Sequence, residues 1–497
     1  MTTAHAQPAI DAIREQLRQA GQEHLLTFVD QITPEQRSAL LAQIASLDLR
    51  SLPGLIERYV RASSDAAKGS SAKIEPVPYF AADHTSKDRG WDREAYARKG
   101  RELIGAGKIA AFTVAGGQGS RLGYDGPKGC YPGGAVTGKP LFACLADWIL
   151  AAQERYRPAT GSIPWYIMTS PLNHEATVAF FKANGYFGLK STDVMFFPQG
   201  VMPSLDLKTG RVLLSQKHEV ALNPDGHGGS LKALYTSGAI DDMAKRGVEH
   251  ISYTQIDNPL VRVIDPAFIG LHAASPQSSG EMSSKMVAKS DPGEKVGVLC
   301  KVNGRVGVIE YSDLPAELAQ ARDADGGLTY SAGSIAVHMI GVEFVRRLNA
   351  GAGGAGGGFT LPFHRAEKKV PFVDLSTGQR VEPTSNNAVK LEAFVFDALP
   401  MAARSIVLET QRLDEFAPIK NATGSDSPAS CAEIQTRRAA RWLGGAGCRV
   451  PYKNCGAVDA VIEISPRTAM DAGEMRAGGA GAAKVPAAIP SGAKVVI

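Results

Sequence analysis

The stretch Ile109-Ala-Ala-Phe-Thr-Val-Ala-Gly-Gly-Gln-Gly-Ser-Arg-Leu-Gly-Tyr-Asp-Gly-Pro-Lys-Gly129 decides the fold. Its apolar beginning, residues 109–114, predicts a buried strand. The glycines that follow predict a loop whose backbone N–H groups can lie close to a phosphate chain. Arg121 and Lys128 add the positive charge that such a loop lacks, so the whole stretch predicts a nucleoside triphosphate site.

Two other kinds of glycine loop fit this stretch less well. A Walker loop needs Gly-Lys-Ser/Thr at the start of a helix, but Lys128 is followed by Gly129. A dinucleotide fingerprint needs a third glycine where this chain has Leu122, and Gly126 with Pro127 disfavours a helix directly after the loop. A dinucleotide oxidoreductase therefore stays only as an alternative hypothesis.

Short apolar runs alternate with helical stretches after residue 105. Strands are predicted at 109–114, 165–168, 194–197 and 251–256, and helices at 142–154 and 229–246. This alternation is typical of an α/β fold with a mostly parallel sheet covered by helices on both faces. Ligands bind beyond the carboxyl ends of such strands. The glycine loop and Asp257 both follow a strand, so we expect them at the same edge.

Three regions are expected along the chain: a helical N-terminal region at 1–104, an α/β domain with the nucleotide loop at 105–385, and a small C-terminal domain with an Ala/Gly-rich tail at 386–497. In the first region, Thr33-Pro34-Glu35-Gln36 predicts a helix start, because threonine caps, proline fits the first turn and glutamine completes a capping box. The glycine-rich run at 349–358 predicts a flexible surface insertion.

Composition narrows the function classes. The chain has 497 residues, of which 44% are hydrophobic and 21% charged, as in ordinary globular proteins. The net charge of +4, with no run of basic residues, does not favour nucleic acid as a partner. No apolar run of about eighteen residues and no signal core occur, so neither a membrane partner nor secretion is expected. The six scattered cysteines lack zinc spacing and predict free thiols in a reducing cytoplasm.

Several further motifs accompany the glycine loop in a fixed order. They are Phe196-Phe-Pro-Gln199-Gly, Asn223-Pro-Asp-Gly-His-Gly-Gly229, Gln255-Ile-Asp257-Asn-Pro, Val308-Ile-Glu310-Tyr-Ser, Lys368-Lys-Val-Pro, Val389-Lys390-Leu-Glu and Asp414-Glu-Phe-Ala-Pro-Ile-Lys420-Asn. Together with the loop they resemble the eukaryotic-type UDP-sugar pyrophosphorylases, above all those that act on N-acetylglucosamine 1-phosphate. The resemblance extends from about residue 76 to about residue 466.

The resemblance implies a Rossmann-like nucleotidyltransferase that forms a UDP-sugar and pyrophosphate from UTP and a sugar 1-phosphate. The oxygen of the sugar phosphate attacks the α-phosphorus in line, so catalysis rests on positioning and on cations rather than on a protein nucleophile. N-acetylglucosamine 1-phosphate is the expected sugar phosphate. Glucose 1-phosphate or a broad range of sugar phosphates is the alternative, and a non-catalytic sugar-nucleotide binding protein is a third hypothesis.

Phosphate and metal sites are expected around the loop. Ala115, Gly116, Gly117 and Gly119 are predicted to bind the nucleotide, and the cations Arg121, Lys128 and Lys390 are predicted to be catalytic, Lys390 by resemblance alone. Asp257 is predicted to bind Mg²⁺, because a carboxylate at a strand end suits this ion. The alternative for Asp257 is an Asx turn that begins the loop.

Base and sugar contacts follow from the resemblance. Gln199 and Gly226 are implied at the uracil edge, and Gly297 and Glu310 at the sugar. Glu310 could instead be a surface charge at a strand edge. The N-acetylglucosamine enzymes have asparagine where this chain has His227 and Ser334, at positions that face the sugar, so relaxed sugar specificity is expected.

Overall fold

The computed structural model describes residues 6–62, 72–350, 361–478 and 485–497. The glycine-rich run predicted to be a flexible insertion lies almost wholly outside these ranges. The chain divides into two compact units that are interleaved in sequence. Unit 1 combines Met1–Ala72, Gly200–Gly229 and Leu361–Val395, and unit 2 combines Lys73–Gln199, Ser230–Thr360 and Phe396–Ile497.

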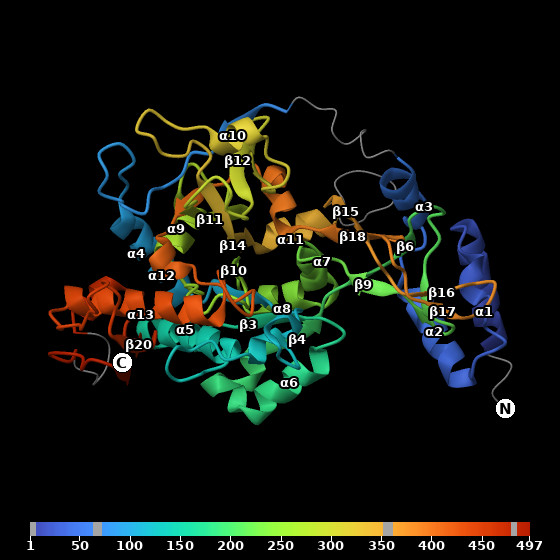
Figure 1. Ribbon diagram of the computed structural model, residues 1–497, viewed down its shortest axis with the longest axis horizontal. Helices are drawn as coiled ribbons and strands as arrows, with labels where there is room; N and C mark the ends of the chain where they lie inside the picture. Colours follow the sequence, from blue (N-terminus) through green and yellow to red (C-terminus); the bar gives the residue numbers. More distant parts are fainter. Residues whose placement is uncertain (1–5, 63–71, 351–360, 479–484) are drawn as a thin grey trace. The chain divides into compact units, whose positions relative to one another are not determined.

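A ten-stranded mixed sheet forms the centre of unit 2 and is flanked by helices (Figure 1). Its main path is β1 (Ile74–Pro76), β12 (Val298–Val302), β14 (Ala332–Gly341), β10 (His250–Gln255), β2 (Ile109–Val114), β3 (Trp165–Thr169) and β4 (Val194–Pro198). β11 (Met282–Ala288) pairs with β14 and with β19 (Val407–Glu409), and β13 (Arg305–Ile309) pairs with β12. The predicted α/β fold with a sheet between helices is thus confirmed, and the sheet contains both parallel and antiparallel pairs.

The four predicted strands form the parallel half of this sheet. β10, β2, β3 and β4 run parallel to one another, and their bounds agree with the predicted ranges within one residue. β2 is buried almost throughout, as its apolar sequence requires. The other half is largely antiparallel: β14 runs against β10, β11 and β12.

The helices of unit 2 include α4 (Arg93–Gly105), α5 (Leu141–Tyr156), α6 (His174–Ala183), α8 (Ala239–Lys245), α9 (Pro266–Ala274), α10 (Ala316–Gln320), α11 (Val342–Asn349), α12 (Arg412–Glu415), α13 (Pro428–Gly445) and α14 (Ala472–Arg476). The predicted helix at 142–154 is α5. The predicted helix at 229–246 is wrong as a single element, because Gly238 has φ +79° and separates α7 (Gly229–Thr236) from α8. That left-handed conformation ends a helix and favours glycine.

Unit 1 consists of helices and short strands. Its helices include α1 (Ala6–Gln19), α2 (Pro34–Ser46) and α3 (Leu52–Ile56), and β15 (Phe363–Lys368), β18 (Ala388–Ala393) and β6 (Leu205–Asp206) form a three-stranded sheet. Shorter pairs are β5 (Val201–Pro203) with β9 (Leu222–Pro224), β7 (Leu214–Gln216) with β8 (Glu219–Val220), and β16 (Phe372–Val373) with β17 (Arg380–Val381). The predicted capping box of α2 is present, since the Thr33 hydroxyl accepts from Gln36 N and the Gln36 side chain accepts from Thr33 N.

All six cysteines are free thiols, as predicted, and four of them are buried. In the part of the chain that the structure describes, no helix has both the length and the apolar character needed to cross a membrane.

Candidate active site

The carboxyl ends of the parallel strands gather predicted nucleotide and metal residues at one edge of the unit 2 sheet. Ala115 directly follows β2, Gln199 follows β4, and Asp257 lies two residues beyond β10. The backbone N–H of Ala115 donates to the carbonyl of Met168 at 2.7 Å, which extends the β2–β3 pairing to the start of the loop. The expectation that the loop and Asp257 share one edge is therefore confirmed.

The glycine loop folds back on itself before any α-helix begins. Gly119 N donates to Gly126 O at 2.9 Å, and Lys128 N donates to Gly117 O at 3.0 Å. Short 3₁₀ turns, Ser120–Leu122 and Lys128–Cys130, occupy the places where a dinucleotide or Walker loop would start a helix. This geometry disfavours the oxidoreductase hypothesis, because a dinucleotide pyrophosphate sits at a helix N-terminus.

Asn173 holds the loop in place, and the sequence interpretation missed it. The Asn173 side chain is 1% exposed, and its Nδ2 donates to the carbonyls of Ala115 at 3.0 Å and Gly117 at 3.2 Å. Its Oδ1 accepts from Ser170 N at 2.8 Å. Asn173 lies just after β3, so its place after a parallel strand is the signal that could have identified it.

The three predicted loop glycines have different surroundings. A Cβ at Gly116 would stand 3.1 Å from Oε1 of Gln199, so glycine lets that amide, 9% exposed, lie against the loop. A Cβ at Gly119 would stand 2.8 Å from the ring of Tyr124. A Cβ at Gly117 would meet no described atom within 4 Å. Only Gly117 therefore faces space that a ligand could fill, whereas the other two glycines are explained by contacts within the chain.

Lys128 and Asp257 form the charged centre of the site. Lys128 Nζ lies 3.6 Å from Asp257 Oδ2, and the two side chains are only 16% and 15% exposed. Partly buried charges interact more strongly than surface pairs, because solvent screens them less. Arg121 is exposed on the first 3₁₀ turn, and its side chain has no hydrogen bond or ion pair with any described residue.

The Asx turn considered for Asp257 belongs instead to its neighbour. Leu260 N donates to Oδ1 of Asn258 at 3.2 Å, so Asn258 makes the turn and the Asp257 carboxylate is left to face Lys128. Asn258 is 5% exposed.

A cavity of about 150 Å³ adjoins Asp257 and contains two of the predicted sugar residues, Gly297 and Ser334. Ser334 N donates to Gly297 O at 2.8 Å. A Cβ at Gly297 would stand 3.3 Å from Oε1 of Glu310, so the Glu310 carboxylate packs beside Gly297 rather than standing free on a strand edge. Unit 2 thus brings the predicted metal residue Asp257 together with Gly297, Ser334 and Glu310 of the predicted sugar residues.

Two lysines line the same cavity and were not among the predicted site residues: Lys295 and Lys420. Lys420 lies in one of the motifs that resemble the family, but its local sequence does not indicate that its side chain lines this cavity. Its ammonium lies 3.8 Å from Oδ2 of Asp426 and over the ring of Phe416. The cavity lining therefore contains two lysines as well as the Asp257 carboxylate.

A bulge in β14 forms another wall of the cavity. Ser284 of β11 faces His338, and Met286 faces Ser334, so residues 335–337 stand opposite Lys285 alone. Ala336, within the bulge, has φ +53°. A left-handed conformation is costly for a residue with a Cβ, and such strain concentrates at functional sites.

The remaining predicted site residues, Gly226, His227 and Lys390, belong to unit 1. Val395 N donates to Nδ1 of His227 at 3.1 Å, which leaves the proton of the neutral ring on Nε2. The ring stacks on Phe394 with centroids 5.2 Å apart. Gly226 has φ +84°, and a Cβ there would stand 2.4 Å from a backbone oxygen of β18. Lys390 lies on β18, and burial lowers its pKa although Glu392 acts in the opposite direction.

The donor set near Lys128 fits a magnesium ion. Within the described ranges, no three His, Cys, Asp or Glu side chains cluster closely enough to hold a metal ion by themselves. Mg²⁺ does not need such a cage, since it is held in many phosphate sites by one or two carboxylates together with phosphate oxygens and water. Asp257 supplies one carboxylate at the correct edge of the sheet.

Comparison with known proteins agrees with this geometry. Residues 51–425 match the UDPGP family model, described as UTP–glucose-1-phosphate uridylyltransferase. UDP-N-acetylglucosamine diphosphorylase 2 of Arabidopsis thaliana is 37% identical, over 92% of this chain and 89% of that protein. UDP-N-acetylglucosamine pyrophosphorylase of Saccharomyces cerevisiae is 34% identical, over 87% of this chain and 91% of that protein.

A solved structure gives the same result. The uridine diphosphate N-acetylglucosamine pyrophosphorylase of Trypanosoma brucei, crystallised with an inhibitor, superposes with a TM-score of 0.76 at 27% identity, covering 94% of each chain. Enzymes of this kind use UTP and a sugar phosphate, yield a UDP-sugar and pyrophosphate, and generally depend on a divalent metal. The chain belongs to the UDPGP family and is a UDP-sugar pyrophosphorylase, a uridylyltransferase.

Proposed function

We propose that this enzyme forms UDP-N-acetylglucosamine and pyrophosphate from UTP and N-acetylglucosamine 1-phosphate, and that it also accepts glucose 1-phosphate. The observation that carries the proposal is the Lys128–Asp257 pair beside the glycine loop, 3.6 Å apart and largely buried. The names and the identity of the Arabidopsis and yeast relatives support N-acetylglucosamine 1-phosphate as the main sugar phosphate.

In the proposed reaction, an oxygen of the sugar phosphate attacks the α-phosphorus of UTP and pyrophosphate leaves. The phosphate oxygens carry the charge, so Lys128 would stabilise it as a point charge, Arg121 would bind two oxygens at once, and Lys390 would add a third cation. Backbone N–H groups around Gly117 would approach the nucleotide, because that side of the loop is open.

Asp257 would hold Mg²⁺, and the bound ion would neutralise phosphate charge and help to orient the triphosphate. The Lys128 ammonium lies beside the same carboxylate, so Lys128 and the metal ion would both pair with Asp257. Lys295 and Lys420, which line the same cavity, would face the phosphate of the sugar substrate.

The base would be read beside the loop. The carboxamide of Gln199 lies against Gly116, and it offers one donor and one acceptor to the edge of uracil. Gly226 would add a backbone contact. A purine is larger than uracil, and cytosine reverses part of the donor and acceptor pattern, so both would bind less well.

Acceptance of glucose 1-phosphate has its own support. By the resemblance His227 faces the sugar, and an imidazole N–H can donate a hydrogen bond to a sugar hydroxyl. Ser334 is shorter than the asparagine of the N-acetylglucosamine enzymes, and it contributes one hydroxyl rather than an amide. Neither residue excludes an acetamido group.

A panel of sugar 1-phosphates tests the proposal. The purified enzyme is incubated with UTP, Mg²⁺ and one sugar phosphate at a time, and pyrophosphate release is followed. We expect kcat/KM to be highest for N-acetylglucosamine 1-phosphate, with measurable turnover of glucose 1-phosphate. A clear preference for glucose 1-phosphate would show that this sugar phosphate, and not N-acetylglucosamine 1-phosphate, is the main substrate.

A further inference from the structure

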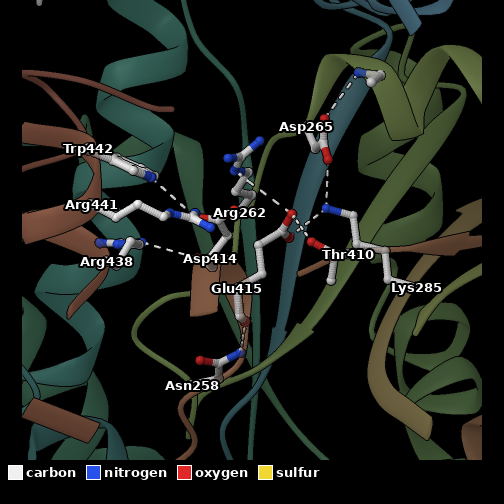
Figure 2. A network of polar contacts seen from close by, with 11 residues as sticks. Asn258, Arg262, Asp265, Lys285, Thr410, Asp414, Glu415, Arg438, Arg441 and Trp442 are labelled. Carbon is white, nitrogen blue, oxygen red and sulfur yellow. Dashed lines mark hydrogen bonds and ion pairs between the residues drawn. The ribbon is translucent and has the colours of Figure 1, made fainter. Parts of the chain in front are cut away.

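A buried cluster of opposite charges lies next to the candidate active site. Lys285 is fully buried, and its Nζ donates to Oδ2 of Asp265 and to Oε2 of Glu415, at 2.6 Å each. Figure 2 shows the ammonium between the two carboxylates. The other oxygen of Glu415 accepts from the hydroxyl of Thr410 at 2.7 Å and lies 3.8 Å from Nε of Arg262.

The cluster is balanced in charge and joins several elements. Lys285 and Arg262 supply two positive charges, and Asp265 and Glu415 two negative ones. Burial alone would raise the pKa of Asp265, but Lys285 and Arg262 hold it well below the usual value. Asp265 also caps α9 through Ala267 N. Breaking such a network leaves uncompensated buried charge, so it fixes the backbone of each element that it joins.

One of those backbones leads directly to the site. The carbonyl of Glu415 accepts from Nδ2 of Asn258 at 2.6 Å, and Oδ1 of Asn258 accepts from Ala417 N at 3.1 Å (Figure 2 shows the first contact). Ile419 N then donates to the carbonyl of Asp257 at 2.8 Å. Hydrogen bonds thus hold segment 415–420 beside residues 257–258, which follow β10.

The end of this segment supplies a wall of the cavity. Phe416, Pro418 and Lys420 all line it together with Asp257. Every hydrogen bond between the segment and residues 257–258 lies between Glu415 and Ile419, immediately before Lys420. Lys420 directly follows this anchored segment, and its own N–H donates to the carbonyl of Asp426 at 2.6 Å.

We propose that the Lys285–Asp265–Glu415 cluster is a positioning device that holds segment 415–420 against the end of β10, and so sets where Lys420 stands for the phosphate of the sugar substrate. This inference rests on the proposed function, because it takes the cavity beside Asp257 as the place of that phosphate. It assigns no chemical step to the cluster itself.

A double-mutant cycle tests the inference. Glu415→Gln keeps the shape of the side chain and removes its charge, and Lys420→Ala removes the group that is positioned. We expect Glu415→Gln to lower kcat/KM for the sugar phosphate about tenfold in the wild-type enzyme, but less than about twofold when Lys420 is already alanine. Equal losses in both backgrounds, or no effect of Lys420→Ala, would overturn the proposal.

A matched control and a milder variant keep the test decisive. Asp242 of α8 bonds to Tyr166 and Arg246 in the same unit, and we expect Asp242→Asn to leave kcat/KM unchanged in both backgrounds. Should Glu415→Gln not fold, Thr410→Val removes one hydrogen bond from the same carboxylate, and it should give a smaller loss with the same dependence on Lys420.

Amide hydrogen exchange measures how firmly segment 415–420 is held, and it does not depend on enzyme activity. The amides of Ala417 and Ile419 should exchange faster in the Glu415 or Thr410 variant, while those of β2 keep the wild-type rate. Unchanged exchange at both amides would overturn the proposal. If the wild-type enzyme releases no pyrophosphate from any sugar phosphate, the proposed function fails, whereas the exchange experiment still tests the cluster.

Discussion

Replacing Lys128 by alanine is the perturbation whose size follows most directly from the structure. The Lys128 ammonium stands 3.6 Å from the Asp257 carboxylate with little solvent around either group. Two unit charges at that separation interact by about 4–5 kcal/mol at an effective dielectric constant of about 20. A phosphate oxygen bound at a similar distance from the Lys128 ammonium would be stabilised by a comparable energy.

Only the part of this energy that grows in the transition state affects kcat. Charge on the α-phosphate and on the leaving pyrophosphate is already present in bound UTP, so a fraction of the interaction contributes to the rate. We therefore expect Lys128→Ala to lower kcat about 10²- to 10³-fold, the loss that removal of one electrostatic donor typically causes. Lys128→Arg should retain part of the rate because it keeps the charge.

The assay is continuous pyrophosphate release at saturating UTP and sugar phosphate, with thermal unfolding as the check on folding. Lys108→Ala is the matched control, since Lys108 pairs with Glu249 at 2.8 Å just before the amino end of β2, away from the carboxyl ends of the strands. A folded Lys128→Ala enzyme with kcat within about threefold of wild type would remove Lys128 from the mechanism.

Four further predictions concern the metal, the base, the sugar and pH. Excess EDTA should abolish turnover and Asp257→Asn most of it, because both remove the proposed Mg²⁺ site; full activity with EDTA would contradict this. Gln199→Ala should narrow the preference for UTP over CTP by about tenfold in kcat/KM, and an unchanged ratio would place base recognition elsewhere. His227→Asn should shift the ratio of kcat/KM towards N-acetylglucosamine 1-phosphate by about tenfold, or ~1.4 kcal/mol, and the ratio measured in competition decides it. Burial lowers the pKa of Lys390, so its ammonium is lost as pH rises through that lowered value. The Lys390→Arg side chain stays protonated, so this variant should remain active at higher pH than the wild-type enzyme. If activity falls at the same alkaline pH in both enzymes, the positive charge at position 390 has no role in turnover.

The parallel half of the sheet could be predicted from sequence because each strand is a short apolar run followed by a turn. β2 and β10 carry that signal on their own, and the strand-end rule then placed Asp257 beside the loop. The break at Gly238 was missed because a single glycine within a helical pattern does not reveal its φ angle.

The antiparallel half and much of the site depend on contacts between distant residues. The pairing of β11 with β14 and the bulge at Ala336 have no local signature. Asn173, Lys295 and Lys420 belong to the site only because three separate segments meet at one edge of the sheet. The expected regions 1–104, 105–385 and 386–497 stay predictions, and the two interleaved units arise from contacts that no local pattern encodes.

The loop glycines illustrate the same limit. Gly116 and Gly119 are predicted to let the nucleotide approach the loop, but the positions of a Cβ at these residues are occupied by Gln199 and Tyr124. Their contact with the nucleotide stays a prediction. Of the three, only Gly117 has open space at its Cβ position that a nucleotide could enter.

Product analysis of the purified wild-type enzyme measures the proposed reaction itself. The enzyme is incubated with UTP, N-acetylglucosamine 1-phosphate and Mg²⁺, and the nucleotide and phosphate products are identified by ³¹P NMR. We predict equal amounts of UDP-N-acetylglucosamine and pyrophosphate, with no such products from the Asp257→Asn enzyme on the same time scale. Unchanged UTP and sugar phosphate after prolonged incubation of the folded wild-type enzyme would contradict it.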